Sequence, residues 1–141
     1  MLKLYHVTKA KYKESILEKG LLANPFERCV YLAPTKEGAL AFVFPMIHEF
    51  NNESLNVQVG EENYTFPKVT INNEFVLFEI DVKFLNKEDI ELSDDHNVHF
   101  FGTEAYRYYG DIPTDAISKI YDYNYEKKEL TLVESKEKEL T

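Results

Sequence analysis

The sequence predicts an α+β fold, and three features of its pattern support this prediction. Residues 2–33 read as a strand, a short helix and a second strand. Residues 75–82 alternate between two faces and form the clearest strand of the chain. Two more strands are predicted at 117–125 and 130–133, joined by a charged turn. With 141 residues, 44% of them hydrophobic, the chain has material for one domain, predicted over residues 1–134.

The first predicted strand takes its apolar positions from Leu2, Leu4 and Val7, and it contains Tyr5 and His6. A histidine near the end of such a strand can reach a cleft instead of the core. His6 is therefore a candidate ligand-binding residue, although a histidine on an apolar strand is more often structural.

A short helix and a second strand are predicted next. Tyr12, Ile16 and Leu17 give this helix one apolar face. Gly20 stands where a left-handed residue would end the helix. Residues 30–32 then form the second short extended segment.

Residues 35–44 predict a second helix, which Thr35 caps and Pro45 ends or kinks. Its inward-facing residues are expected to be Leu40, Val43 and Phe44. Residues 45–73 are the least regular part of the chain and contain two short alternating pieces. We expect them to form a hairpin-like insertion or a lid.

The second half of the chain is predicted to be mostly extended. In the strand at 75–82, one face is apolar and the other includes Glu79 and Asp81, so we expect one end to be partly in water. Residues 86–95 are expected to form an acidic, solvated loop. Pro113 is suited to begin a short helical turn, and the charged tail 135–141 is expected to fray.

Composition and charge limit the classes of function. Acidic residues exceed basic ones by 25 to 16, for a net charge of −9, which disfavours broad nucleic-acid binding and favours neutral or basic protein partners. No apolar run is long enough for a membrane span. The single cysteine, Cys29, fits a reducing cytoplasm; we expect a small buried side chain there, with a nucleophile as the less favoured alternative.

Metal binding is not indicated by the sequence. No spacing of cysteines and histidines resembles a zinc site. His96 and His99 stand three residues apart, but their aromatic neighbours suggest an extended segment, which favours ordinary histidines.

Three residues far apart in the sequence form the candidate site: His6, Tyr31 and Glu104. Taken singly, Tyr31 would be assigned to the core and Glu104 to the solvated surface. Taken together with their surroundings, they resemble the ADP-ribosyltransferase superfamily, in the branch that uses a His–Tyr–Glu triad. The matching pieces are Leu4-Tyr5-His6-Val7-Thr8, Ser15-Ile16-Leu17-Glu18-Lys19-Gly20-Leu21, Val30-Tyr31-Leu32-Ala33, and Glu104 followed by Gly110-Asp111-Ile112-Pro113 and Ile117.

The resemblance implies a fold of two small antiparallel or mixed sheets with short helices around a cleft that holds NAD. By this analogy His6, with Thr8 close by, would bind the adenosine-side ribose of NAD, acting as a compact hydrogen-bond donor. Tyr31 would stack on the nicotinamide ring, and Glu104 would accept a hydrogen bond from the 2′-hydroxyl of the nicotinamide ribose. Arg28 is the candidate for contact with the pyrophosphate or the acceptor.

These residue types suit the chemistry that the resemblance implies. Cleavage of the nicotinamide–ribose bond develops an oxocarbenium-like cation, which a bond to the 2′-hydroxyl and a nearby carboxylate both stabilise. An aromatic face holds the flat nicotinamide in orientation. We therefore expect a mono-ADP-ribosyltransferase that uses NAD and modifies a macromolecule, most readily a protein, in the manner of a toxin or a phage factor.

Two departures from the family patterns disfavour arginine modification and phosphotransfer. Gly102 occupies the position where arginine-specific relatives carry a second Glu or Gln, two residues before the catalytic glutamate. The layout is also similar to the DNA-targeting toxins and to the tRNA 2′-phosphotransferases, but the basic residues of the latter are missing. The alternatives are an inactive module of the same fold that binds and blocks a protein partner, and an NAD glycohydrolase.

Overall fold

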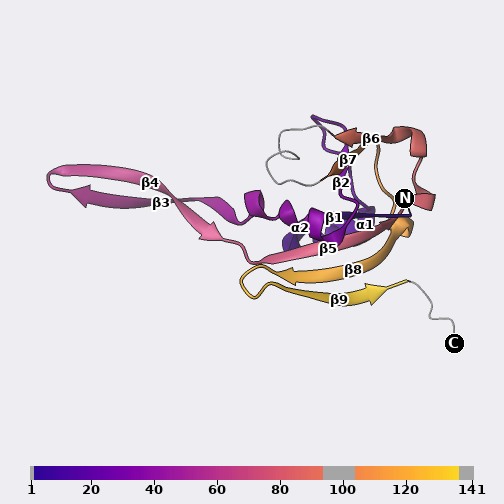
Figure 1. Cartoon of the computed structure of the whole chain (residues 1–141). Helices are drawn as coiled ribbons and strands as arrows, with labels where there is room; N and C mark the ends of the chain where they lie inside the picture. Colours follow the sequence, from indigo (N-terminus) through magenta and orange to yellow (C-terminus); the bar gives the residue numbers. More distant parts are fainter. Residues whose placement is uncertain (1, 94–103, 137–141) are drawn as a thin grey trace.

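The computed structural model of the chain describes residues 2–93 and 104–136, which form an α+β structure of antiparallel strands and two α-helices (Figure 1). The strands are β1 (Lys3–Lys9), β2 (Val30–Leu32), β3 (His48–Val59), β4 (Glu62–Ile71), β5 (Glu74–Asp81), β6 (Ile90–Ser93), β7 (Ala105–Tyr108), β8 (Ile117–Asn124) and β9 (Glu129–Ser135). The helices are α1 (Lys13–Lys19) and α2 (Lys36–Ala41), with short 3₁₀ turns at Ala10–Tyr12, Phe44–Met46, Val82–Phe84, Lys87–Asp89 and Thr114–Ala116.

A four-stranded sheet in the order β1-β5-β8-β9 forms the base of the body. Its inner strand β5 carries the predicted apolar alternation, and both of its faces are buried. Val76, Phe78 and Ile80 are fully buried on one side, while Phe75 and Leu77 pack on the side that α2 covers. The predicted partly wet end of this strand is confirmed at Asp81, which is partly exposed, but is wrong at Glu79, which is only 4% exposed.

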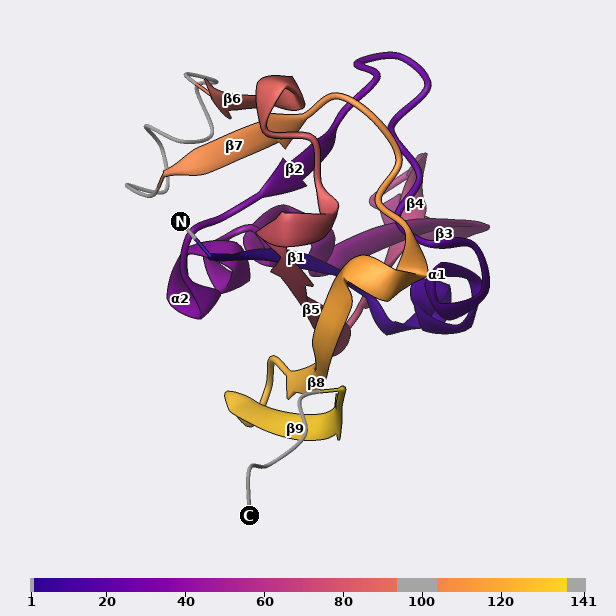
Figure 2. The same ribbon diagram turned by 90° about the vertical axis from the view of Figure 1, so that its right-hand side faces the viewer.

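A three-stranded sheet in the order β2-β7-β6 lies across the first sheet, as Figure 2 shows. The two sheets are joined where Tyr5 and Ala33 exchange two backbone hydrogen bonds of 2.8 Å. The expected acidic loop at 86–95 is wrong in part, because Ile90–Ser93 pairs with the open edge of β7. His96 and His99 lie outside the described residues.

The two helices confirm the predicted caps but not all of the predicted faces. Gly20 ends α1 with a φ of 83°, and the Thr35 side chain accepts a hydrogen bond of 3.0 Å from the Gly38 amide to begin α2. Of the predicted face of α1, Ile16 packs on the core, whereas Tyr12 and Leu17 are largely exposed.

The predicted end of the second helix also needs correction. The α-helix stops at Ala41, and Phe44 begins a 3₁₀ turn instead, with Pro45 in its first positions. Val43 is buried as predicted, but the expected inward position of Phe44 is wrong, because its side chain is 58% exposed.

The predicted insertion is a long two-stranded hairpin, β3 and β4, which projects from the body in Figure 1. A register shift between Phe50 and Ser54 marks an irregularity near its base. Of the helices formed by the described residues, none is long and apolar enough to cross a membrane.

Candidate functional site

His6 lies on β1, and its register partner on β5 is Phe78. Phe78 packs in the core between the two sheets, so His6, on the same face, is directed toward the second sheet. Its Nδ1 is 2.7 Å from the backbone oxygen of Tyr31. A carbonyl oxygen only accepts, so Nδ1 carries the proton. Burial lowers the pKa of His6, and the bond to the Tyr31 carbonyl opposes this only in part. The neutral ring therefore presents Nε2 as a hydrogen-bond acceptor, whereas the sequence analysis expects a donor.

Tyr31 lies on β2, and its aromatic ring is held from two directions. Its hydroxyl donates a hydrogen bond to the Glu27 carboxylate. The guanidinium carbon of Arg107 is 5.7 Å from the ring centroid. Burial raises the pKa of the Tyr31 phenol, and the bond to Glu27 raises it further. The phenol is thus protonated at neutral pH, and its ring is fixed in orientation.

A cavity of about 290 Å³ lies where the two sheets and α2 meet, and both His6 and Tyr31 line it. The other lining residues are Tyr5, Val7, Glu27, Leu32, Ala33, Ala39, Phe42, Pro45, Met46, Ser93 and Ala105. A pocket that is mostly apolar, with a few polar groups converging on it, is typical of a small-molecule site. The structure thus brings two residues of the predicted triad into one cavity.

The other predicted site residues are Glu104, Thr8 and Arg28. Glu104 is exposed and is not among the described residues that line the cavity, although the next residue, Ala105, lines it. Thr8 lies on β1, and Arg28 is an exposed residue with a left-handed φ of 59°. Neither Thr8 nor Arg28 is among the described residues that line the cavity.

Glu27 is the functional candidate that the sequence analysis missed. Besides the first cavity, it lines a second one of about 250 Å³, which it shares with Tyr31, Cys29 and Arg107. The Asn24 side chain accepts hydrogen bonds from the backbone amides of Phe26 and Glu27, at 2.8 and 3.3 Å, and so shapes the loop. An Asn-Pro pair signals a turn, but nothing local indicates that this turn carries Glu27 to Tyr31.

Cys29 is buried as predicted, with 2% of its surface exposed. Burial raises the pKa of the Cys29 thiol, and the nearby Glu27 carboxylate adds to this effect. Because the thiolate is the nucleophilic form, these surroundings disfavour a nucleophilic role.

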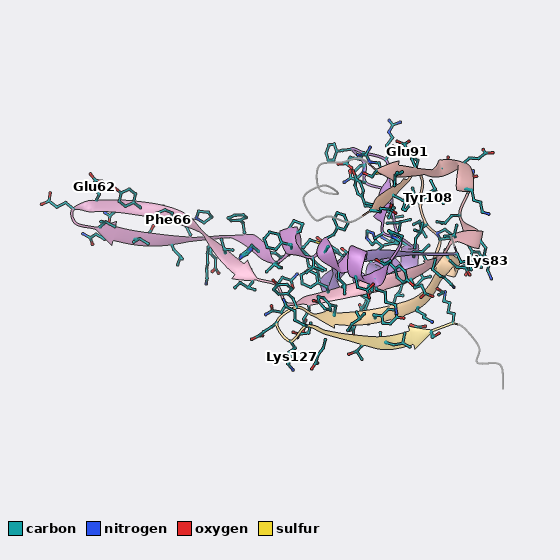
Figure 3. The ribbon with its side chains drawn as sticks, viewed as in Figure 1. Glu62, Phe66, Lys83, Glu91, Tyr108 and Lys127 are labelled. Carbon is teal, nitrogen blue, oxygen red and sulfur yellow. The ribbon has the colours of Figure 1, made fainter. Side chains whose placement is uncertain are left out.

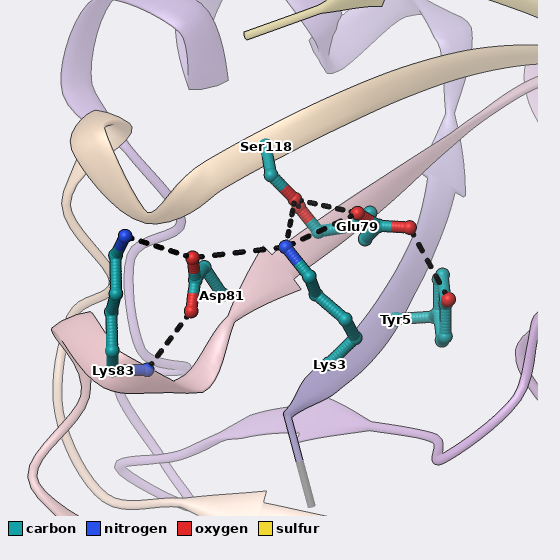
Figure 4. Close-up of polar contacts among 6 residues, drawn as sticks. All are labelled: Lys3, Tyr5, Glu79, Asp81, Lys83 and Ser118. Carbon is teal, nitrogen blue, oxygen red and sulfur yellow. Dashed lines mark hydrogen bonds and ion pairs between the residues drawn. The ribbon is translucent and has the colours of Figure 1, made fainter. Parts of the chain in front are cut away.

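A polar network around Glu79 supports Tyr5, one of the residues that line the cavity (Figure 4). The Tyr5 hydroxyl donates to Oε2 of Glu79 at 3.3 Å, and Ser118 donates to Oε1 at 2.8 Å. Lys3 completes the surroundings of this buried carboxylate at 3.6 Å. Burial, followed by the negative charge of Glu79, raises the pKa of Tyr5 to about 12.

Neither metal ligation nor similarity to known proteins identifies the site. Within residues 2–93 and 104–136, no three or more His, Cys, Asp or Glu side chains gather closely enough to hold a metal ion. No protein-family model matches the sequence, and a search of curated proteins gives no significant match.

Proposed function

We propose that the protein is an NAD-dependent mono-ADP-ribosyltransferase, with an ADP-ribosyltransferase-like fold, that modifies a protein in the cytoplasm. The observation that carries this proposal is the shared cavity, which both His6 and Tyr31 line. Two sheets that meet at a cleft also agree with the architecture that the sequence resemblance implies.

Each residue of the triad has a proposed role, and the surroundings of Tyr31 and His6 support theirs. The ring of Tyr31, fixed by Glu27 and Arg107, offers a flat face to nicotinamide. Glu104 accepts a hydrogen bond from the ribose 2′-hydroxyl, and its charge stabilises the cation that develops on the sugar. His6 accepts a hydrogen bond at Nε2 from a hydroxyl of the nicotinamide ribose, rather than of the adenosine-side ribose that the resemblance implies, since Nδ1 is engaged by the Tyr31 carbonyl.

Glu27 is proposed as the base that accepts the acceptor's proton. In the reaction, the bond between nicotinamide and the anomeric carbon breaks, and nicotinamide leaves with the electron pair. The acceptor's nucleophile bonds to that carbon and loses its proton. Of the described residues that line the cavity, Glu27 alone carries a carboxylate. The Tyr31 hydroxyl engages its Oε2, so we assign Oε1 to the acceptor. Glu27 would thereby take the place of the second Glu or Gln that arginine-specific relatives carry at the position of Gly102.

The residues of the cavity fit one end of NAD better than the other. A volume of about 290 Å³ lies at the lower limit for ligand pockets and suits the nicotinamide and its ribose rather than the whole dinucleotide. The described lining residues include no Lys or Arg, so the pyrophosphate would lie at the mouth of the cavity. We assign its contact to Arg28, which follows Glu27 and is exposed.

The test is incubation of the full chain with NAD labelled on the adenosine side, with and without a cell lysate. We expect nicotinamide release together with transfer of the label to protein. Glu104→Gln should lower both rates about a hundredfold or more, the scale of losing a charge-stabilising group. Glu134→Gln, which changes an exposed carboxylate on β9, is the matched control and should leave both rates unchanged.

The same experiment separates the alternatives. Glu27→Gln should lower transfer more than nicotinamide release, because only transfer needs the acceptor to lose a proton. Release of free ADP-ribose without any transfer would favour an NAD glycohydrolase. Absence of both products, with no heat of NAD binding by calorimetry, would reject the enzymatic proposal and favour a module that binds a protein partner.

A further inference from the structure

The β3–β4 hairpin carries a continuous row of apolar side chains on one face. Leu55 pairs with Phe66, and Val57 pairs with Tyr64, so these four side chains share a face. Val59 continues the row toward the turn. We call these five residues the apolar strip; each of them is between 42% and 63% exposed.

Toward the tip, the opposite face of the same hairpin is polar, whereas nearer the body it carries Phe50, Val69 and Ile71, which are 72%, 41% and 64% exposed. Its polar register pairs are Asn56 with Thr65 and Gln58 with Asn63. The Thr65 hydroxyl donates to the Asn56 side chain at 3.1 Å. An isolated two-stranded ribbon is marginally stable in water, so the hairpin gains stability if the apolar strip is covered. Figure 3 shows Phe66 on the projecting ribbon, well away from the body.

The two ends of the apolar strip carry opposite charges. Glu62 lies at the tip, two residues before Tyr64, and accepts a hydrogen bond of 2.5 Å from the Tyr64 hydroxyl. Lys68 lies two residues beyond Phe66, toward the body, and pairs with Glu53 at 3.0 Å. Residues two apart on a strand share a face, so Glu62 and Lys68 bound the strip on its own side.

We propose that the apolar strip is a self-association surface, covered by the same strip of a second copy of this chain. The two hairpins pack face to face and run antiparallel about a two-fold axis, as isologous interfaces do. The tip of each hairpin then lies over the base of the other. In this arrangement Glu62 of each copy approaches Lys68 of the other copy, and the apolar side chains interdigitate between them.

The length of the hairpin makes this arrangement compatible with the acidity of the chain. Each copy carries a net charge of −9, so two bodies in contact would repel each other. The 10 residues of β4 span about 33 Å at ~3.3 Å per residue. That separation is several times the Debye length of about 8 Å at physiological salt. The antiparallel arrangement therefore keeps the two charged bodies apart while their strips meet.

Packing through the faces is favoured over pairing through the strand edges. Edge pairing would extend the sheet but leave the apolar strip exposed to water. Pro67 also removes a backbone donor from β4. A second copy of the strip places a lysine opposite Glu62 and a glutamate opposite Lys68, which a partner of another kind does not.

The test is sedimentation equilibrium of the full chain, without NAD, over a wide range of concentrations. We expect a monomer–dimer equilibrium. Phe66→Glu, in the pair of the strip nearest the body, should raise the dissociation constant at least about tenfold. Asn63→Glu, which adds the same charge on the polar face of the same hairpin, is the matched control and should leave the constant unchanged. Thermal unfolding of each variant, followed by circular dichroism, checks that the body is folded.

A charge exchange tests the antiparallel arrangement itself. Glu62→Lys and Lys68→Glu should each weaken the dimer, and the double variant should restore it. The internal pair with Glu53 is lost in both proteins that carry Lys68→Glu, so it cannot explain a rescue. A monomer at every concentration would overturn the proposal, even if the hairpin captured another protein. A dimer insensitive to Phe66→Glu, or a double variant that does not recover, would also overturn it.

Discussion

Strands β5 and β4 both contain phenylalanine but lie in opposite environments. Strand β5 is apolar without interruption from Phe75 to Phe78, whereas β4 alternates apolar and polar residues, and Phe78 on β5 is 0% exposed while Phe66 on β4 is 50% exposed. The inner strand β5 has neighbours on both edges, β1 and β8, and packed layers on both faces. Strand β4 has β3 alone within the described residues. The difference shows that the burial of a strand in this protein depends on the strands and layers packed against it rather than on strand propensity.

The largest expected effect is the loss of a large side chain from β5. Phe78→Ala should lower the free energy of unfolding by about 3–5 kcal/mol, because it removes a fully buried ring from the core between the sheets. The matched variant on the hairpin, Phe66→Ala, should change it by less than about 1 kcal/mol in dilute protein. Urea unfolding of both variants measures the contrast. Equal losses would show that the hairpin folds as part of the same core.

Two glycines provide the same contrast at the backbone. Gly20 has a φ of 83°, and a Cβ added there would lie 2.2 Å from the backbone oxygen of Ile112. Gly60, in the hairpin turn, has a φ of 64° and nothing within 4 Å of such a Cβ. Gly20→Ala should therefore lower the free energy of unfolding by about 3 kcal/mol, from strain and overlap together. Gly60→Ala should cost about 1 kcal/mol, from backbone strain alone. Thermal unfolding of the two variants ranks them, and a reversed order would contradict this account.

The features that the sequence predicts well are those with local causes. The alternation of 75–82, the stop at Gly20 and the cap at Thr35 each depend on residues a few positions apart. The paired strands 48–71 are also marked by their own alternation and by a glycine turn. Short-range patterns of this kind carry most of the secondary structure.

The features that it misses depend on contacts made far along the chain. Glu79 is buried because Ser118, 39 positions away, and Tyr5, 74 positions away, bind its carboxylate. Strand β6 forms because β7 offers it an edge. The position of Glu27 beside Tyr31 follows from the loop geometry rather than from any motif. For the same reason the sequence suggests a triad, but the cavity, and the absence of Lys and Arg from its described lining, appear only in the fold.

Loss of the hydrogen bond between Tyr5 and Glu79 should have a smaller, pH-dependent effect on the free energy of unfolding. Tyr5→Phe removes one hydrogen bond to the Glu79 carboxylate and should lower the free energy of unfolding by about 1 kcal/mol at neutral pH. The pKa of Tyr5 is raised to about 12 in the folded protein, against about 10 in the unfolded chain. The unfolded chain thus loses its proton first, and the contribution of Tyr5 is complete below pH ~10 and is lost as the pH rises through ~12.

Urea unfolding at alkaline pH measures this effect as a difference between two proteins. The wild type should lose stability more steeply than Tyr5→Phe between about pH 10 and 12. Tyr12→Phe, which removes an exposed hydroxyl, is the control and should follow the wild type. Parallel profiles for the wild type and Tyr5→Phe would contradict the assigned link to Glu79.

The smallest expected effect concerns His6 on the acid side, and it bears directly on the proposed site. The pKa of His6 is lowered by burial, so below about pH 6.5 the unfolded chain takes up a proton that the folded protein refuses. The stability that this provides is complete above pH ~6.5 and is lost as the pH falls through the folded pKa. His6→Gln should flatten the acid limb of the unfolding free energy, whereas His48→Gln, at an exposed position on the hairpin, should not.

The ¹⁵N chemical shifts of the His6 imidazole provide a second measurement, because a proton held on Nδ1 by the Tyr31 carbonyl leaves Nε2 unprotonated. A proton found on Nε2 instead would remove the acceptor that we assign to the ribose hydroxyl, and with it the role of His6 in the cavity.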